Sequence, residues 1–119
     1  AWICGIAESW APFFWVGGAR GFTSGLVNVA PALSLTMQHA LEAGDYGAAM
    51  QIWHQIKPFE DLRARRNNAN NVSAVKEAMA QLGLCAATVR PPISDLADNE
   101  RAEVRQILVR LGIETHKVR

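Results

Sequence analysis

Side chains that could do chemistry are few in the first third of the chain and scattered through the rest. Cys4 with His39 or His54 could pair a thiol nucleophile with a base. Both histidines, however, fall in patterns typical of helices, away from the short apolar run that carries the cysteine. His39, His54 and His116 also lack a spacing that would gather metal ligands. The sequence therefore predicts neither a thiol active site nor a metal site.

Two further patterns could contact phosphate. The run GGARG at residues 17–21 is rich in glycine but lacks the Lys-Ser/Thr ending of a phosphate-binding loop. Arg63, Arg65 and Arg66 could bind a phosphate, but we favour a solvated helix end that the helix dipole stabilises. The formal net charge of +1 argues against bulk electrostatic capture of nucleic acid.

The stretch GGARGFTSGLVNVAP, residues 17–31, positions the more promising side chains. Residues 22–24 are predicted as a strand, and Gly25 leaves the end of that strand open to a ligand or a neighbouring backbone. Pro31 is suited to the first position of a helix, and Asn28 is a possible cap.

An earlier strand is predicted at residues 2–4, followed by a short helix at residues 10–16 that Ser9 would cap. Strand, helix and strand make a βαβ unit, whose strands should lie parallel and whose crossover should be right-handed. Two parallel strands do not make a stable sheet by themselves, so we expect a larger sheet around them.

The chain from Pro31 onward has a helical pattern throughout. Helices are predicted over residues 32–43, from Asp45 through a kink or break at Pro58 to Arg66, from Asn71 or Ser73 to Gly83, and from a cap at Asp98 to Gly112. The expected apolar faces of the last two helices are Val72, Val75, Met79 and Leu82, and Val104, Ile107, Leu108 and Leu111. The tail, residues 113–119, is predicted to fray.

Charge is distributed unevenly along the chain. Residues 1–41 contain only two formal charges, Glu8 and Arg20, so this apolar segment must be covered on most sides. We therefore expect the C-terminal piece of a longer polypeptide. The chain has no apolar run of the roughly 20 residues that span a bilayer. Two cysteines do not make a disulfide framework, which predicts a cytoplasmic protein.

The predicted fold class is α/β, with the last two βα units of a (β/α)8 barrel followed by a C-terminal helical appendix of about three helices. Residues 1–44 would be the end of the barrel, with its seventh and eighth strands and their helices. Residues 45–119 would be the helical domain.

The order of these motifs resembles the dihydrodipicolinate synthase and N-acetylneuraminate lyase superfamily, which comprises Schiff-base class I aldolases built as (β/α)8 barrels. The residues that carry the resemblance are Cys4-Gly5, the run from Gly18 to Pro31 with Asn28, Ala43-Gly44-Asp45, Lys57-Pro58-Phe59, Asn71 to Lys76, Leu82-Gly83-Leu84 and Val89-Arg90-Pro91-Pro92. These matches run nearly from end to end.

The resemblance implies a substrate pocket at the carboxyl ends of the two strands. Gly5 would lie beside the carbonyl region of the substrate, and Thr23 would line the pocket. Ser24 and Glu8 are further substrate-binding candidates because they flank these two residues. Thr23 could also be a simple filler of the barrel interior.

The resemblance also implies a mechanism in which a lysine amine forms a Schiff base with a 2-keto acid and a tyrosine handles protons beside it. The family carries this lysine on the sixth strand and the tyrosine on the fourth, and neither strand is in this chain. Lys57, Lys76, Lys117 and Tyr46 are therefore not expected to be catalytic. No catalytic residue is predicted here, no cofactor is expected, and the 119-residue chain alone should be inactive.

Ile6-Ala7-Glu8 stands where the synthases often have an aspartate after the glycine, and NNVSAVKEAM and VRPPIS look more like the sugar-acid branch. We therefore expect a lyase or dehydratase of a 2-keto-3-deoxy sugar acid. One alternative is dihydrodipicolinate synthase, which condenses pyruvate with aspartate semialdehyde. A third hypothesis is a non-enzymatic helical interaction module.

The partners expected from the resemblance are a 2-keto acid, the N-terminal part of the barrel and further copies in a tetramer or dimer. Neither nucleic acid nor a membrane is expected. Trp53 and Leu108 are candidate exposed apolar positions that would serve the assembly or cap the barrel.

Overall fold

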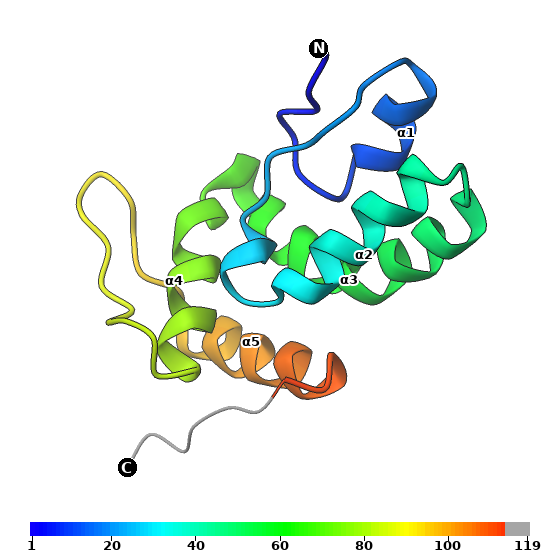
Figure 1. The fold of residues 1–119 in the computed structure, drawn as a ribbon. Helices are drawn as coiled ribbons and strands as arrows, with labels where there is room; N and C mark the ends of the chain where they lie inside the picture. The colour runs from blue at the N-terminus through cyan, green and yellow to red at the C-terminus, as the bar shows by residue number, and fades with distance from the viewer. Residues whose placement is uncertain (114–119) are drawn as a thin grey trace. The chain divides into compact units, whose positions relative to one another are not determined.

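The computed structural model describes residues 1–113 (Figure 1). The contacts between residues divide the chain into two units. The first unit is Ala1–Lys57, and the second begins at Pro58. The boundary predicted after residue 44 divides the end of a barrel from a helical appendix. It is a different kind of boundary from the division by contacts, and it stays a prediction.

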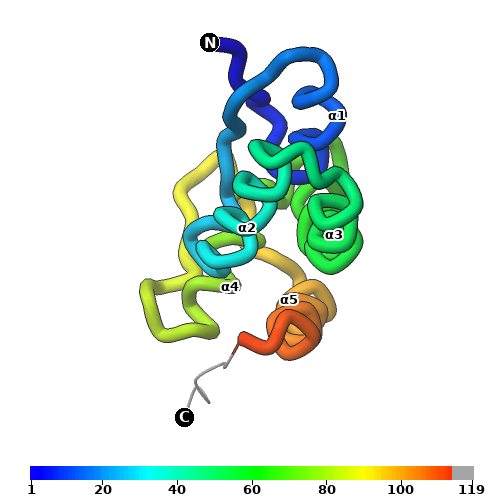
Figure 2. Tube along the Cα trace, turned by 45° about the vertical axis from the view of Figure 1, so that its right-hand side comes forward, coloured from blue at the N-terminus to red at the C-terminus, as the bar shows by residue number. Residues whose placement is uncertain are grey.

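The first unit is built on a helical hairpin. It contains α1 (Ala11–Val16), the short 3-10 helix η1 (Leu26–Asn28), α2 (Pro31–Glu42) and the first half of α3 (Tyr46–Asn68). Helix α2 and the first half of α3 run side by side (Figures 1 and 2). The turn between them uses Gly44 at φ 73° and Asp45, whose Oδ1 accepts the Ala48 N–H at 2.9 Å, as the sequence predicts. The buried apolar side chains of the hairpin are Met37, Leu41, Ala49, Ile52 and Ile56.

The two predicted strands are reduced to one parallel bridge between Cys4 and Phe22. The Cys4 N–H donates to the Gly21 carbonyl and the Thr23 N–H to the Cys4 carbonyl, each at 2.9 Å. The predicted parallel direction is thus confirmed, while the predicted strands at residues 2–4 and 22–24 are wrong for the chain by itself. No strand forms within residues 1–113, because a lone pair of parallel segments has no neighbouring strand to extend its hydrogen bonding.

Two predicted helix caps are also wrong. Helix α1 begins one residue later than expected, after Trp10, and the Ser9 hydroxyl donates to the Ile6 carbonyl at 3.2 Å instead. Asn28 lies within η1, where its side-chain amide donates to the Gly25 carbonyl at 3.1 Å. Helix α2 begins at Pro31 as predicted, without a side-chain cap, because proline brings no N–H to satisfy.

Helix α3 does not break at Pro58. Its backbone dihedral angles leave the helical region only at Arg65, where ψ is 149°. Arg66, Asn67 and Asn68 then follow with φ of 51°, 56° and 66°. The break predicted at Pro58 is therefore wrong, whereas the helix end predicted at Arg66 agrees with the structure. Asparagine tolerates positive φ better than most residues, which suits the segment that follows.

The second unit pairs α4 (Asn71–Gln81) with α5 (Asp98–Arg110), which lie in contact (Figure 1). The buried side of α4 is not the predicted Val-Met-Leu face, since Val72 is 44% exposed. Its buried residues are Ser73, Ala74, Glu77, Ala78 and Gln81. Small residues permit close helix packing, and the polar ones have hydrogen-bond partners: Ser73 donates to the Ser94 carbonyl and Gln81 to the Arg101 carbonyl.

The last helix agrees better with the sequence pattern. Val104, Ile107 and Leu108 are buried, and Gly112 adopts φ 71° after the helix end. Asp98 is the first helical residue rather than the cap, and the Ala97 N–H donates to the Glu100 carboxylate at 3.3 Å. Because Leu108 is fully buried, it does not offer an exposed contact for assembly. The predicted fraying tail and His116 fall largely beyond residue 113, outside the described residues.

The first unit presents large apolar side chains to its surroundings, as the low charge of residues 1–41 predicts. Trp2 is 81% exposed, Val16 75% and Ile3 62%. Exposed apolar side chains in this number are typical of a surface that another part of a protein covers. None of the helices within residues 1–113 combines the length and apolar character that a membrane crossing requires.

Candidate functional site

The parallel bridge brings Gly5 and Thr23 to the same end of two adjacent segments. Cys4 accepts the Thr23 N–H, and the Thr23 hydroxyl lies 3.5 Å from the Cys4 carbonyl oxygen. Both Gly5 and Thr23 are exposed. A Cβ at Gly5 would meet no atom within 4 Å, so open space adjoins this glycine. The two residues that sequence analysis puts at a pocket are thus neighbours with accessible surfaces.

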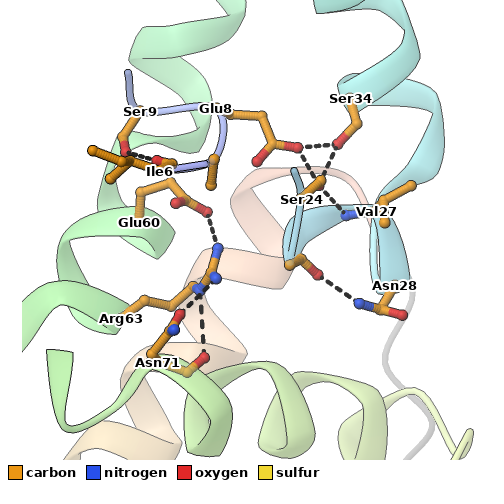
Figure 3. A network of polar contacts seen from close by, with 12 residues as sticks. Ile6, Glu8, Ser9, Ser24, Val27, Asn28, Ser34, Glu60, Arg63 and Asn71 are labelled. Atoms are coloured by element: carbon orange, nitrogen blue, oxygen red, sulfur yellow. Dashed lines mark hydrogen bonds and ion pairs between the residues drawn. The ribbon is translucent and has the colours of Figure 1, made fainter. Parts of the chain in front are cut away.

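Glu8, three residues after Gly5, forms a polar cluster with two serines (Figure 3). Its side chain is 0% exposed, and its Oε1 accepts hydrogen bonds from the hydroxyls of Ser24 and Ser34. The two serine oxygens are 3.2 Å apart. A buried carboxylate needs such donors to offset its lost hydration. We call Glu8, Ser24 and Ser34 the Glu8 cluster.

The Glu8 cluster joins three segments that are distant in sequence. Glu8 follows the bridge residue Cys4, Ser24 follows Thr23, and Ser34 lies in the first turn of α2. Ser24 also accepts the Val27 N–H at 2.8 Å, which fixes the start of η1 (Figure 3). Sequence analysis did not identify Ser34, because a single serine in a helical pattern carries no signal for a partner 26 positions earlier.

The second carboxylate oxygen of Glu8, Oε2, is buried and has no donor among residues 1–113. Ala7 beside it adopts φ 60° and is itself buried, and its carbonyl oxygen lies 3.8 Å from the Cys4 thiol. This left-handed residue sits immediately before the buried carboxylate. Because its side chain is completely buried, Glu8 does not reach the open space beside Gly5.

A second polar cluster occurs in the unit that begins at Pro58 (Figure 3). The Arg63 guanidinium donates to the Glu60 carboxylate at 2.8 Å and to the Asn71 side-chain oxygen at 2.6 Å. Both charged side chains are nearly buried, with 11% and 6% exposed. Arg63 thus connects α3 to the start of α4, and its interpretation as part of a solvated helix end is wrong.

The other two arginines of the run, Arg65 and Arg66, form ion pairs at the left-handed turn of residues 66–68. Arg66 donates to Glu100 and to the Asn70 side-chain oxygen, at 3.0 and 2.6 Å, and Arg65 makes a bidentate pair with Glu103 at 2.7 Å. The Arg66 hydrogen bond lowers the pKa of Glu100 to about 2 despite burial of the carboxylate, and donors from Asn70 and the Ala97 backbone add to it. The same pairings raise the pKa of Arg66 and of Arg65. These two arginines keep contact with solvent, but both are held by ion pairs with α5.

The remaining candidates do not come together. Cys4 is buried, whereas His39 and His54 are exposed on α2 and α3. His54 stacks edge-on against Trp53, with 5.0 Å between ring centroids, and Lys57 lies 5.4 Å over the Trp53 ring. Within residues 1–113, no three His, Cys, Asp or Glu side chains gather as metal ligands.

The chain belongs to the dihydrodipicolinate synthetase family, whose model matches residues 1–111. This is the family that the motif order resembles, and its members include enzymes named as synthases and as dehydratases.

Two relatives illustrate this range. The chain is 42% identical over 90 residues to a 4-hydroxy-tetrahydrodipicolinate synthase of Thermomicrobium roseum, covering 76% of this chain and 28% of that protein. It is 34% identical over 95 residues to a probable 5-dehydro-4-deoxyglucarate dehydratase of Allorhizobium ampelinum, covering 79% of this chain and 31% of that protein.

Solved structures agree with the family assignment. The dihydrodipicolinate synthase of Bacillus clausii is 47% identical with a TM-score of 0.91, over 95% of this chain and 38% of that one. The corresponding enzyme of Oceanobacillus iheyensis is 51% identical with a TM-score of 0.89, over 94% and 37%. The chain thus spans roughly a third of the length of the proteins that it matches.

Proposed function

We propose that this chain is the C-terminal part of a (β/α)8 lyase that forms a Schiff base with a 2-keto acid. In this proposal, residues 2–4 and 22–24 are the tips of the seventh and eighth barrel strands, which become full strands when the rest of the sheet lies beside them. The observation that carries the proposal is the parallel Cys4–Phe22 bridge, which sets Gly5 beside Thr23 at the carboxyl ends of the two segments.

The residues of this chain supply one wall of the pocket. The exposed Gly5 leaves room for the substrate carbonyl region. Thr23 is also exposed, and its hydroxyl, which makes only a long 3.5 Å contact with the Cys4 carbonyl, would hydrogen-bond the substrate. Glu8 and Ser24, both candidates for substrate contact, act from behind this wall. Because Glu8 is buried and accepts from Ser24, it holds the segment that carries Thr23 in position.

The reacting lysine lies outside this chain in our proposal. It attacks the 2-keto group, and the resulting iminium accepts the electron pair when a neighbouring carbon–oxygen or carbon–carbon bond breaks. Lys57 and Lys76 are half-buried residues of α3 and α4 and are not assigned the catalytic role, and the chain alone is expected to be inactive. We further propose that the full enzyme acts in the cytoplasm as a tetramer or dimer, without a cofactor.

We propose a 2-keto-3-deoxy sugar acid as the substrate, with loss of water as the reaction. Ile6-Ala7-Glu8 in place of the usual aspartate, and the motifs at residues 70–79 and 89–94, support this choice. The relative named as a probable 5-dehydro-4-deoxyglucarate dehydratase belongs to the same class.

Dihydrodipicolinate synthase is the second candidate. It is favoured by the similarity of the chain to two solved structures at 47% and 51% identity, because both of those proteins are dihydrodipicolinate synthases. The non-enzymatic helical module is disfavoured by the family match over residues 1–111.

A turnover assay separates the two enzymes. The full-length polypeptide is incubated either with 5-dehydro-4-deoxyglucarate or with pyruvate and aspartate semialdehyde, and consumption of each is followed. The proposal predicts rapid loss of the sugar acid and condensation that is slower by a factor of about 100 or more, which corresponds to about 2.7 kcal/mol in the barrier. The reverse preference would establish the second candidate.

A further inference from the structure

A cleft between α4 and α5 is separate from the clusters described above. It has a volume of about 630 Å³ and lies entirely within the second unit. Pockets for small molecules commonly enclose about 300–1,000 Å³. Its lining combines small apolar side chains, including Ala80 and Ala102, with charged ones from both helices. The cleft therefore has the size and mixed chemistry of a small-molecule site.

Gln81 lines this cleft and carries a buried acceptor without a partner among residues 1–113. The residue is 4% exposed, and its side-chain nitrogen donates to Glu77 Oε1 at 2.8 Å and to the Arg101 carbonyl at 2.9 Å. These two acceptors fix the orientation of the amide, because a flipped amide would set its oxygen against both. Oε1 is thus left buried without a donor among residues 1–113. A buried acceptor without a partner is costly, and a donor from a ligand would remove that cost.

Two arginines of α5 line the same cleft one helical turn apart. Arg105 is exposed and makes no hydrogen bond or ion pair within the described residues. Arg101 uses only Nε, which donates to the Leu96 carbonyl at 3.2 Å and lies 3.9 Å from Glu77 Oε2. By contrast, Arg63, Arg65 and Arg66 are all engaged with side-chain acceptors. The guanidinium groups at the cleft therefore keep unused donors.

We propose that this cleft binds a small carboxylate that carries a hydroxyl or ammonium group on the adjacent carbon. The carboxylate pairs with the guanidinium groups of Arg101 and Arg105, whose planar donors match its two oxygens. The hydroxyl or ammonium hydrogen meets Gln81 Oε1. Glu77 and Asp98 also line the cleft and balance the two arginines, which disfavours a multiply charged anion such as phosphate. This site does not depend on the proposed lyase activity.

Three probes of similar size test the proposal. L-lactate, L-alanine and propionate differ only in carrying a hydroxyl, an ammonium or neither, and their binding to the full-length protein is measured by ligand-observed NMR. The 2-keto acid pocket is first blocked by borohydride reduction with pyruvate, and the same titrations are run without the block. We expect lactate or alanine to bind more tightly than propionate by a factor of about ten or more, as expected for pairing a buried acceptor. The stronger of the two tells whether the hydroxyl or the ammonium is recognised.

Variants assign the binding to the cleft. Arg105→Gln removes an exposed, unpaired charge and should weaken the binding of the tighter-binding probe by about tenfold without affecting folding. Arg110→Gln removes the same charge from the same helix outside the cleft and should have no effect. Binding that is equal for all three probes, absent, or unaffected by Arg105→Gln would overturn the proposal.

Discussion

Ser34, in the first turn of α2, donates a hydrogen bond to Glu8, a carboxylate that is completely shielded from solvent. Ser24 donates to the same oxygen, so one buried acceptor ties α2 to the segments on both sides of the Cys4–Phe22 bridge. Gly5 and Thr23 thus lie in segments that are joined by a polar contact that neither residue makes.

The first prediction concerns this contact. Ser34→Ala removes one donor from a buried carboxylate and should lower the free energy of unfolding by about 1–3 kcal/mol. Thr36→Ala is the matched control, because the Thr36 hydroxyl is exposed and donates only to the Ala32 carbonyl of its own helix. The control should stay within about 0.5 kcal/mol of the parent. Denaturant titration of the full-length protein measures both, and equal effects would contradict the role given to the Glu8 cluster.

The second prediction separates pocket lining from packing at Thr23. Thr23→Val keeps the shape of an exposed side chain but removes its hydroxyl. If Thr23 hydrogen-bonds the substrate, kcat/KM should fall by about 10- to 100-fold, which corresponds to about 1.4–2.7 kcal/mol, while the unfolding midpoint stays unchanged. Thr23→Ser should retain most of the activity. A loss of stability without a loss of kcat/KM would instead identify Thr23 as a filler of the barrel interior.

Much of the local structure could be predicted from the sequence because it follows local rules. Pro31, Asp45 and Gly112 mark helix ends through the restrictions of single residues. The buried side of α4 could not be predicted, because Ser73 and Gln81 become favourable core residues only through partners in the segments from residue 94 onward.

The ion pairs of α5 and the Glu8 cluster also depend on residues that are distant in sequence. Arg65 and Arg66 pair with Glu103 and Glu100, which are more than 30 positions away, so no local sequence pattern predicts these pairs. Family motifs identified Gly5 and Thr23 as site candidates. The contact between Glu8 and Ser34 could not be found in this way, because it depends on how α2 packs against the start of the chain.

The third prediction concerns acid stability. The pKa of Glu100 is about 2 in the folded chain, below its ordinary value of 4.5. Its ionised form therefore stabilises the fold fully above pH 4.5, and this contribution is lost as the pH falls toward 2. Glu100→Gln should reduce the loss of stability between about pH 5 and pH 3, as measured by urea unfolding midpoints.

Arg66→Gln should flatten the same pH dependence, because the Arg66 hydrogen bond is the main cause of the lowered pKa. The pH dependence of stability in the double variant Glu100→Gln/Arg66→Gln should be no flatter than in the flatter of the two single variants, because each single change removes the same interaction. Additive effects would show that Glu100 and Arg66 act through different partners.

The fourth prediction concerns the left-handed turn at Arg66, Asn67 and Asn68. Asn67→Ala should destabilise the protein by about 1 kcal/mol, because alanine adopts positive φ less readily than asparagine. Asn67→Gly should be neutral or slightly stabilising. Ala80→Gly, within helix α4, should show the opposite preference and cost about 1 kcal/mol. Thermal unfolding measures all three, and a larger loss for Asn67→Gly than for Asn67→Ala would rule out the left-handed conformation.

The most direct test of the central claim is borohydride reduction of the full-length protein with 5-dehydro-4-deoxyglucarate or pyruvate, followed by peptide mapping. We predict a stoichiometric adduct on a lysine outside this chain, with Lys57, Lys76 and Lys117 unmodified. The absence of an adduct with either compound, or an adduct on one of those three lysines, would contradict the account.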